Sequence, residues 1–132
     1  MPSVTAFPNI RNLVDPLIGT PFTAMNCWDL VSHLFAQGFG LPVAATAAYF
    51  NFDEMCEVWY RGDPRDPLPL AQPWDLVVIT THRGHAVSDH VGLVIDSQLF
   101  VHSRADHHGV AIARLRTWRA WLLQLARLRR LL

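Results

Sequence analysis

The sequence has little cysteine, no net charge and no long apolar run, and each of these features argues against a class of protein. Only two of the 132 residues are cysteines, Cys27 and Cys56, so a disulfide framework is excluded and a reducing compartment is favoured. The formal net charge is zero, which argues against a nucleic-acid partner. No apolar stretch approaches the roughly 20 residues that cross a bilayer, so we expect no integral membrane segment.

The composition is otherwise that of a globular protein. Half of the residues are hydrophobic, which is enough for one core, and the length predicts a single domain over residues 1–132. Residues 1–5 have neither the basic nor the apolar part of a secretory signal. We therefore expect synthesis in the cytoplasm without a signal peptide.

A short helix is predicted over Pro8–Leu17, and a longer amphipathic helix follows it. Asn26 is a good N-cap for the second helix, which should end near Gly38 or Gly40. Cys27 then occupies the first turn, where the helix dipole favours the thiolate. Because Cys27 also shares the apolar stripe of this helix, a merely buried thiol is an equal alternative from this stretch alone.

The second half of the chain reads as a set of strands. A further helix is predicted over Phe52–Tyr60 and a proline-rich loop over Gly62–Pro73. Closely spaced apolar runs then predict an antiparallel meander, and helices followed by strands indicate an α+β fold. The four predicted strands cover residues 75–80, 90–96, 99–103 and 110–114.

The segment Leu115–Leu132 carries leucines and tryptophans at helical spacing and is predicted to form a C-terminal helix. Such a helix would pack on the sheet, and its alternative role is to dock on a protein partner. Binding to an anionic membrane surface is a weaker alternative.

Two of the seven histidines, His90 and His102, flank a predicted hairpin. A three-residue turn around Ser97 would set Gly92 opposite His102, and both imidazoles would then project from one face of the sheet. A turn of even length would place them on opposite faces. The remaining histidines lack a recognised metal-ligand spacing, so we expect neither a metal nor a cofactor.

Four short motifs together resemble the NlpC-type cell-wall cysteine peptidases. These motifs are Asn26–Val31 at a helix start, Pro73–Val77 before a strand, Asp89–Leu93 at the next strand and Phe100–Ser103 after it. The likeness extends over Leu17–Trp118 and is greatest for the phage-tail branch. It implies a papain-like domain with N-terminal helices on the β-meander and a helix at the C-terminus.

The resemblance also implies roles for individual residues. By position, Cys27 would be the nucleophile, His90 the base and His102 the residue that orients His90. A lower-ranked set would contact the substrate: Asn26, Trp28 and Asp89.

The function implied is hydrolysis of amide bonds in peptidoglycan stem peptides. A phage tail, host lysis or a secretion machine would deliver the protein to the cell wall. Three alternatives stay open, namely a non-catalytic tail or assembly module, an antibacterial amidase effector, and an acyltransferase that uses the same nucleophile.

Overall fold

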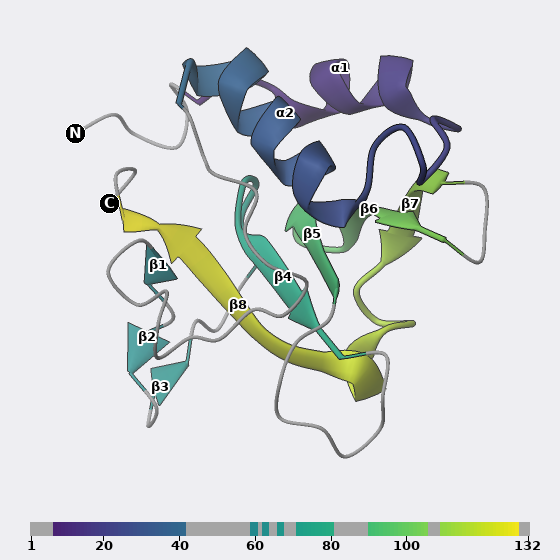
Figure 1. The fold of residues 1–132 in the computed structure, drawn as a ribbon. Helices are drawn as coiled ribbons and strands as arrows, with labels where there is room; N and C mark the ends of the chain where they lie inside the picture. The colour runs from purple at the N-terminus through teal and green to yellow at the C-terminus, as the bar shows by residue number, and fades with distance from the viewer. Residues whose placement is uncertain are drawn as a thin grey trace.

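The computed structural model describes residues 7–41, 59–60, 62–63, 66–67, 71–80, 90–105 and 109–129 (Figure 1). Its helical elements are α1 (Ile10–Val14), the 3-10 turns η2 (Asp15–Leu17) and η3 (Arg119–Trp121), and α2 (Cys27–Phe39). Its strands are β1 (Trp59–Tyr60), β2 (Gly62–Asp63), β3 (Asp66–Pro67), β4 (Leu76–Ile79), β5 (His90–Val94), β6 (Leu99–Arg104), β7 (Gly109–Arg114) and β8 (Leu122–Leu128).

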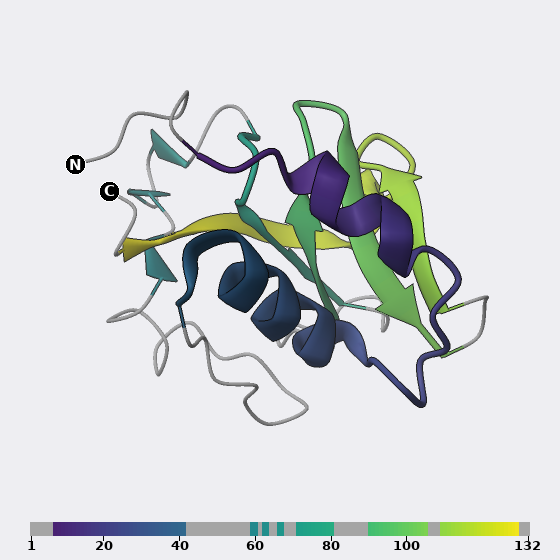
Figure 2. The ribbon, with the colours of Figure 1, turned by 90° about the horizontal axis from the view of Figure 1, so that it is seen from above.

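The main sheet has six strands in the order β1-β8-β4-β5-β6-β7, and every pairing in it is antiparallel. Strands β4 to β7 form the predicted meander. Helices α1 and α2 lie side by side on one face of this sheet (Figures 1 and 2). The predicted α+β architecture, with N-terminal helices packed on an antiparallel meander, is confirmed.

The sheet buries apolar side chains on both faces. The larger cluster lies under the helices and joins α1 and α2 to alternate residues of β5, including Val91 and Leu93. A second cluster lies on the opposite face and contains Val94 and Phe100, covered by residues of the segment 115–125. Because strand side chains alternate, His90 and His102 lie on the face of this second cluster.

Helix α2 begins and ends as its sequence predicts. The Asn26 side chain accepts from the amide of Asp29 at 2.8 Å, and the Asp29 carboxylate accepts from the amide of Asn26 at 3.1 Å, so the two form a capping box. At the other end Gly40 adopts a left-handed conformation with φ of 64°, which glycine does without strain. The predicted first helix is also found, as α1 followed by η2, with Asn9 as its N-cap.

The predicted C-terminal helix over Leu115–Leu132 is wrong. The described part of this segment forms a turn, η3 and then β8, which pairs with β4 along the edge not used by β5. Ala126 and Leu128 face the larger core, whereas Leu125 packs on the second cluster. Apolar residues of β8 contribute to the clusters on both faces of the sheet, and such a pattern does not by itself distinguish a strand from a helix.

Two smaller predictions also need correction. Trp59–Tyr60, the end of the helix predicted over Phe52–Tyr60, forms a strand that pairs with β8, and residues 52–58 lie outside the described residues. The loop predicted over Gly62–Pro73 contains the short antiparallel pair β2–β3. No helix in the described ranges is long and apolar enough to cross a membrane.

Trp74 ties three parts of the fold together. Its backbone has a φ of 75°, which is strained for a residue with a side chain. The indole Nε1 donates to the carbonyl of Pro8 at 3.0 Å, and the backbone amide donates to the carbonyl of Val94 at 3.0 Å. Its ring meets Phe39 edge-on at 4.8 Å, so these contacts hold the strained conformation.

Substitution of Gly38 by alanine tests this packing. An added Cβ would lie 2.5 Å from the Trp74 ring, so Gly38→Ala should lower the free energy of unfolding by about 1–3 kcal/mol. Glycine to alanine in a helix ordinarily stabilises, which makes the sign of the change diagnostic. Urea unfolding measures it, with the exposed neighbour Gln37→Ala as a control that should be neutral. A more stable Gly38→Ala protein would contradict the packing.

Asp75 and Arg127 form an ion pair between the start of β4 and β8. The carboxylate is only 2% exposed and accepts from Arg127 Nε at 2.9 Å and from the amide of Gln72 at 2.9 Å. Burial raises the pKa of Asp75, and the hydrogen bonds and charge of its partners offset only part of this rise. The ionised carboxylate is therefore tolerated only because Arg127 accompanies it.

Arg127→Met should destabilise the protein more at neutral pH than in acid. We expect a loss of about 2–3 kcal/mol at pH 7, below the roughly 3–5 kcal/mol of a fully buried pair because Arg127 is 23% exposed. Because the folded-state pKa of Asp75 lies above its unfolded value, stability is lost as pH rises through the folded pKa, and more so without Arg127. Urea unfolding from pH 3 to 7 tests this, with exposed Arg114→Met as control. A pH-independent loss would contradict it.

Candidate active site

Cys27 is the first residue of α2 and is 9% exposed, with a free thiol. Burial raises its pKa, and the nearby carboxylate of Asp29 raises it further. Backbone amides of Val91, Trp28 and Cys27 itself point at the sulfur and lower the pKa, but the net shift is upward. The helix N-terminus therefore acts as the sequence predicts, yet the expectation that Cys27 favours the thiolate is wrong because burial outweighs it. Cys27 rests as a thiol and needs a base.

His90 and His102 form a buried pair on neighbouring strands. The Nε2 atom of His90 lies 2.8 Å from Nδ1 of His102, and the two residues are 7% and 3% exposed. Gly92 pairs with His102, which is the register that a three-residue turn predicts. A Cβ on Gly92 would lie 2.9 Å from the Phe100 ring and 3.2 Å from the His102 Cβ, so the close approach of the two strands here requires glycine.

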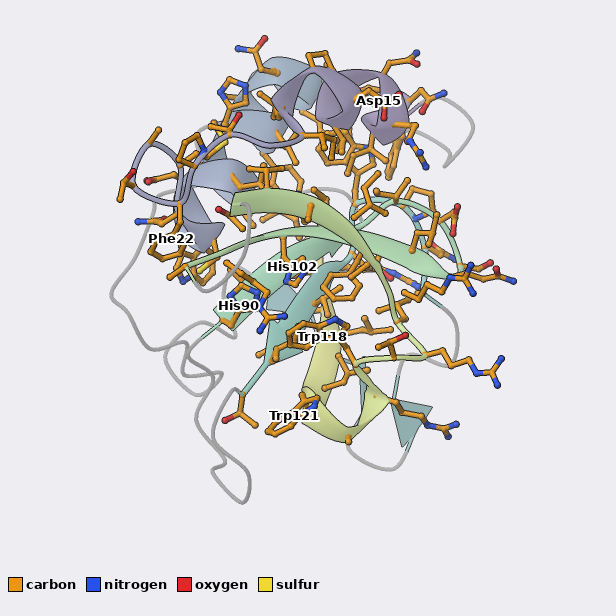
Figure 3. The ribbon with its side chains drawn as sticks, turned by 90° about the vertical axis from the view of Figure 1, so that its right-hand side faces the viewer. Asp15, Phe22, His90, His102, Trp118 and Trp121 are labelled. Atoms are coloured by element: carbon orange, nitrogen blue, oxygen red, sulfur yellow. The ribbon has the colours of Figure 1, made fainter. Side chains whose placement is uncertain are left out.

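An aromatic cover lies over this histidine pair on the face away from the helices (Figure 3). The Trp118 ring meets His102 edge-on at 5.0 Å, and it lies 6.3 Å from the ring of His90. Phe100 packs 4.8 Å from His102, and the Arg104 guanidinium lies 4.6 Å above Trp118. Sequence reasoning does not identify Trp118, because its spacing also fits the apolar stripe of a helix.

The N-terminus of α2 and the histidine pair both lie at the start of β5, with Cys27 in the cluster under the helices and the two imidazoles on the other face of the sheet. Val91, whose amide points at the Cys27 sulfur, directly follows His90 in the chain. The N-terminus of α2 therefore abuts the same end of β5 that carries His90. A capped helix start that carries a thiol and a hydrogen-bonded imidazole pair therefore lie at the same end of β5, and a nucleophile with a base and an orienting group would use side chains of these types.

The other predicted site residues have different surroundings. Asn26 is occupied in the capping box, and Trp28 is 5% exposed within the larger core, so both have structural roles and their contact with substrate stays a prediction. Asp89 lies outside the described residues. Among the described ranges no group of three or more possible ligand side chains could hold a metal ion.

Solved structures of NlpC/P60 proteins are among those that share this fold. The chain resembles an NlpC/P60 family protein from Bacillus cereus ATCC 10987, with a TM-score of 0.67 and 19% identity over 96% of this chain. It also resembles a lipoprotein-like NLP/P60 family protein from Staphylococcus aureus subsp. aureus Mu50, with a TM-score of 0.63 and 18% identity over 91% of this chain. For the NlpC/p60 domain of the peptidoglycan hydrolase SagA the TM-score is 0.57, with 15% identity over 89% of this chain.

The fraction of each solved structure that this chain covers differs among the three. This chain spans 40% of each of the first two proteins and 94% of the SagA domain. No protein-family model matches the sequence, and no curated protein is significantly similar to it. The structural similarity thus confirms the predicted NlpC-type, papain-like fold. At these low sequence identities, the similarity shows the fold alone.

The raised pKa of Cys27 gives a direct prediction for alkylation. In a Cys56→Ser background, the rate of iodoacetamide labelling should rise with pH to a midpoint above that of the same protein unfolded in urea. The reason is that burial disfavours the charged thiolate only in the folded state. Mass spectrometry of the labelled peptide measures both curves. A lower midpoint in the folded protein would contradict the burial argument.

Proposed function

We propose that this chain is a cysteine peptidase or amidase that hydrolyses amide bonds of peptidoglycan stem peptides, acting as a single domain over residues 1–132. The observation that carries this proposal is the buried contact of His90 with His102 beside the N-terminus of the helix that begins at Cys27. The fold of a domain described as part of a peptidoglycan hydrolase supports the substrate class.

The first chemical step follows from the protonation state of Cys27. Since burial keeps the thiol protonated, His90 must accept its proton as the thiolate forms. The Nε2 atom of His90 contacts His102, so we assign the proton transfer to Nδ1. His102 keeps the ring of His90 in one orientation and one tautomer, as the third member of a catalytic triad does.

The later steps use the same groups. The thiolate attacks the scissile carbonyl carbon, and the amide of Cys27 at the helix start donates a hydrogen bond to the resulting oxyanion. The protonated His90 then gives its proton to the leaving amine, and a thioester with Cys27 forms. Finally His90 takes a proton from water, the resulting hydroxide attacks the thioester, and the acid product leaves while His90 returns the proton to the thiolate.

Delivery by a phage tail, by lysis or by a secretion machine stays part of the proposal. The alternative of a non-catalytic module loses its main support, because the docking helix that favoured it is replaced by η3 and β8 inside the fold. The buried imidazole pair favours the enzyme.

Incubation with purified sacculi tests the proposal. The wild-type protein should release stem peptides detectable by mass spectrometry, and Cys27→Ala should abolish release. His90→Ala should lower the rate by about 10²–10⁴-fold, since the variant lacks the general base. His102→Ala should lower it less, because the base is present but free to rotate.

A matched control separates these effects from a general loss of histidine. His33→Ala changes a partly exposed histidine on α2 and should retain full activity. Circular dichroism establishes that each variant is folded. A folded wild-type protein without any release, or a fully active Cys27→Ala, would overturn the hydrolase proposal.

A further inference from the structure

Ser103 is a buried hydroxyl that the proposed mechanism does not use. It follows His102 on β6, is fully buried, and donates from Oγ to the carbonyl of Met25 at 2.6 Å. The contact joins residues 78 positions apart in the chain. Met25 lies two residues before Cys27, so this hydrogen bond attaches the start of α2 to the strand that carries His102.

The segment that leads into α2, residues 19–26, is also attached to the sheet at its N-terminal end. Val110, the partner of Ser103 on β7, accepts from the amide of Gly19 at 2.9 Å and donates to the carbonyl of Thr20 at 2.9 Å. At Gly109 a Cβ would lie 1.9 Å from the Thr20 carbonyl oxygen, so the two backbones are in close contact. Residues 19–26 therefore run between two attachments on β6 and β7.

Beyond the last residue pair of the β5–β6 hairpin, contacts with the start of α2 take the place of further pairing between the two strands. The pairing of β5 with β6 ends at Gly92 and His102. If it continued by one residue on each strand, Val91 would lie opposite Ser103. At this position the amide of Val91 points at the Cys27 sulfur, and the hydroxyl of Ser103 binds Met25. The end of the hairpin thus receives the N-terminus of α2 on both of its strands.

We propose that Ser103 is a positioning residue that fixes the sulfur of Cys27 against the amide of Val91, at the end of β5 that begins with His90. The hydrogen bond to Met25 restrains the backbone just before the Asn26 cap. Without it, the first turn of α2 can move away from β5 while the rest of the helix stays packed. This role in catalysis rests on the proposed function, but the placement of Cys27 can be measured without activity.

Alkylation of Cys27 is the first measurement, made in the Cys56→Ser background with iodoacetamide across a pH series. Ser103→Ala should move the midpoint of the labelling rate down toward that of the unfolded chain, since loosening the helix start exposes the sulfur and burial is the largest cause of the raised pKa. Ser97→Ala, at the exposed opposite end of the same hairpin, is the matched control and should keep the wild-type curve.

A second pair of variants covers the case that Ser103→Ala does not fold. Threonine keeps the hydroxyl and valine has the same shape without it, so Ser103→Thr should retain the wild-type midpoint and Ser103→Val should lose it. A role in stability alone would change the free energy of unfolding in urea but leave the labelling midpoint of the folded protein unchanged. Equal midpoints for the folded threonine and valine variants would overturn the proposal.

Release of stem peptides from sacculi is the third measurement. Because displacement of a reacting group by about 1 Å can cost 10²-fold in rate, Ser103→Ala should lower release by up to about 100-fold, and Ser103→Thr should restore it. If the labelling midpoint shifts but even the wild type releases nothing, the placement of Cys27 stands and the hydrolase proposal fails. If release is unaffected in a folded Ser103→Ala, the positioning role is wrong.

Discussion

The pairing of Gly92 with His102 is the constraint on which the candidate site depends. A shift of one residue would send one imidazole to the helix-covered face and break the contact between the two rings. The turn after β5 fixes this register, because the Asp96 carboxylate accepts from the amides of Gln98 and Leu99 at 2.8 and 3.0 Å. A small turn at one end of the hairpin thus determines the chemistry available at the other end.

The burial of Cys27 has a consequence for the kind of catalysis that this site supports. A thiolate and imidazolium ion pair would be ready before substrate arrives, whereas a buried thiol needs the imidazole to remove its proton during the reaction. Three backbone amides point at the sulfur and compensate part of the cost of charge there. In the proposed reaction the thiolate would therefore form only when His90 accepts the proton, and the resting thiol would react slowly with other electrophiles.

Local signals predicted the parts of the fold that local interactions determine. The Asn26 cap, the Gly40 stop and the hairpin register each follow from a few neighbouring residues, and the structure has all three. The C-terminal strand could not be predicted in this way, because the free edge of β4 selects it and its apolar pattern also fits a helix. For the same reason the position of Trp118 over His102 follows only from the tertiary fold.

The position of β8 in the sheet also determines the order in which the strands of the chain can pair. Although it comes last among the described strands, β8 lies between β1 and β4, so the sheet stays divided until residues 122–128 have been synthesised. Pairings between such distant segments close large loops and form slowly. During translation β4 therefore lacks its second neighbouring strand until β8 has been made. The indole of Trp118 likewise covers the two imidazoles only after nearly all of the described chain has left the ribosome.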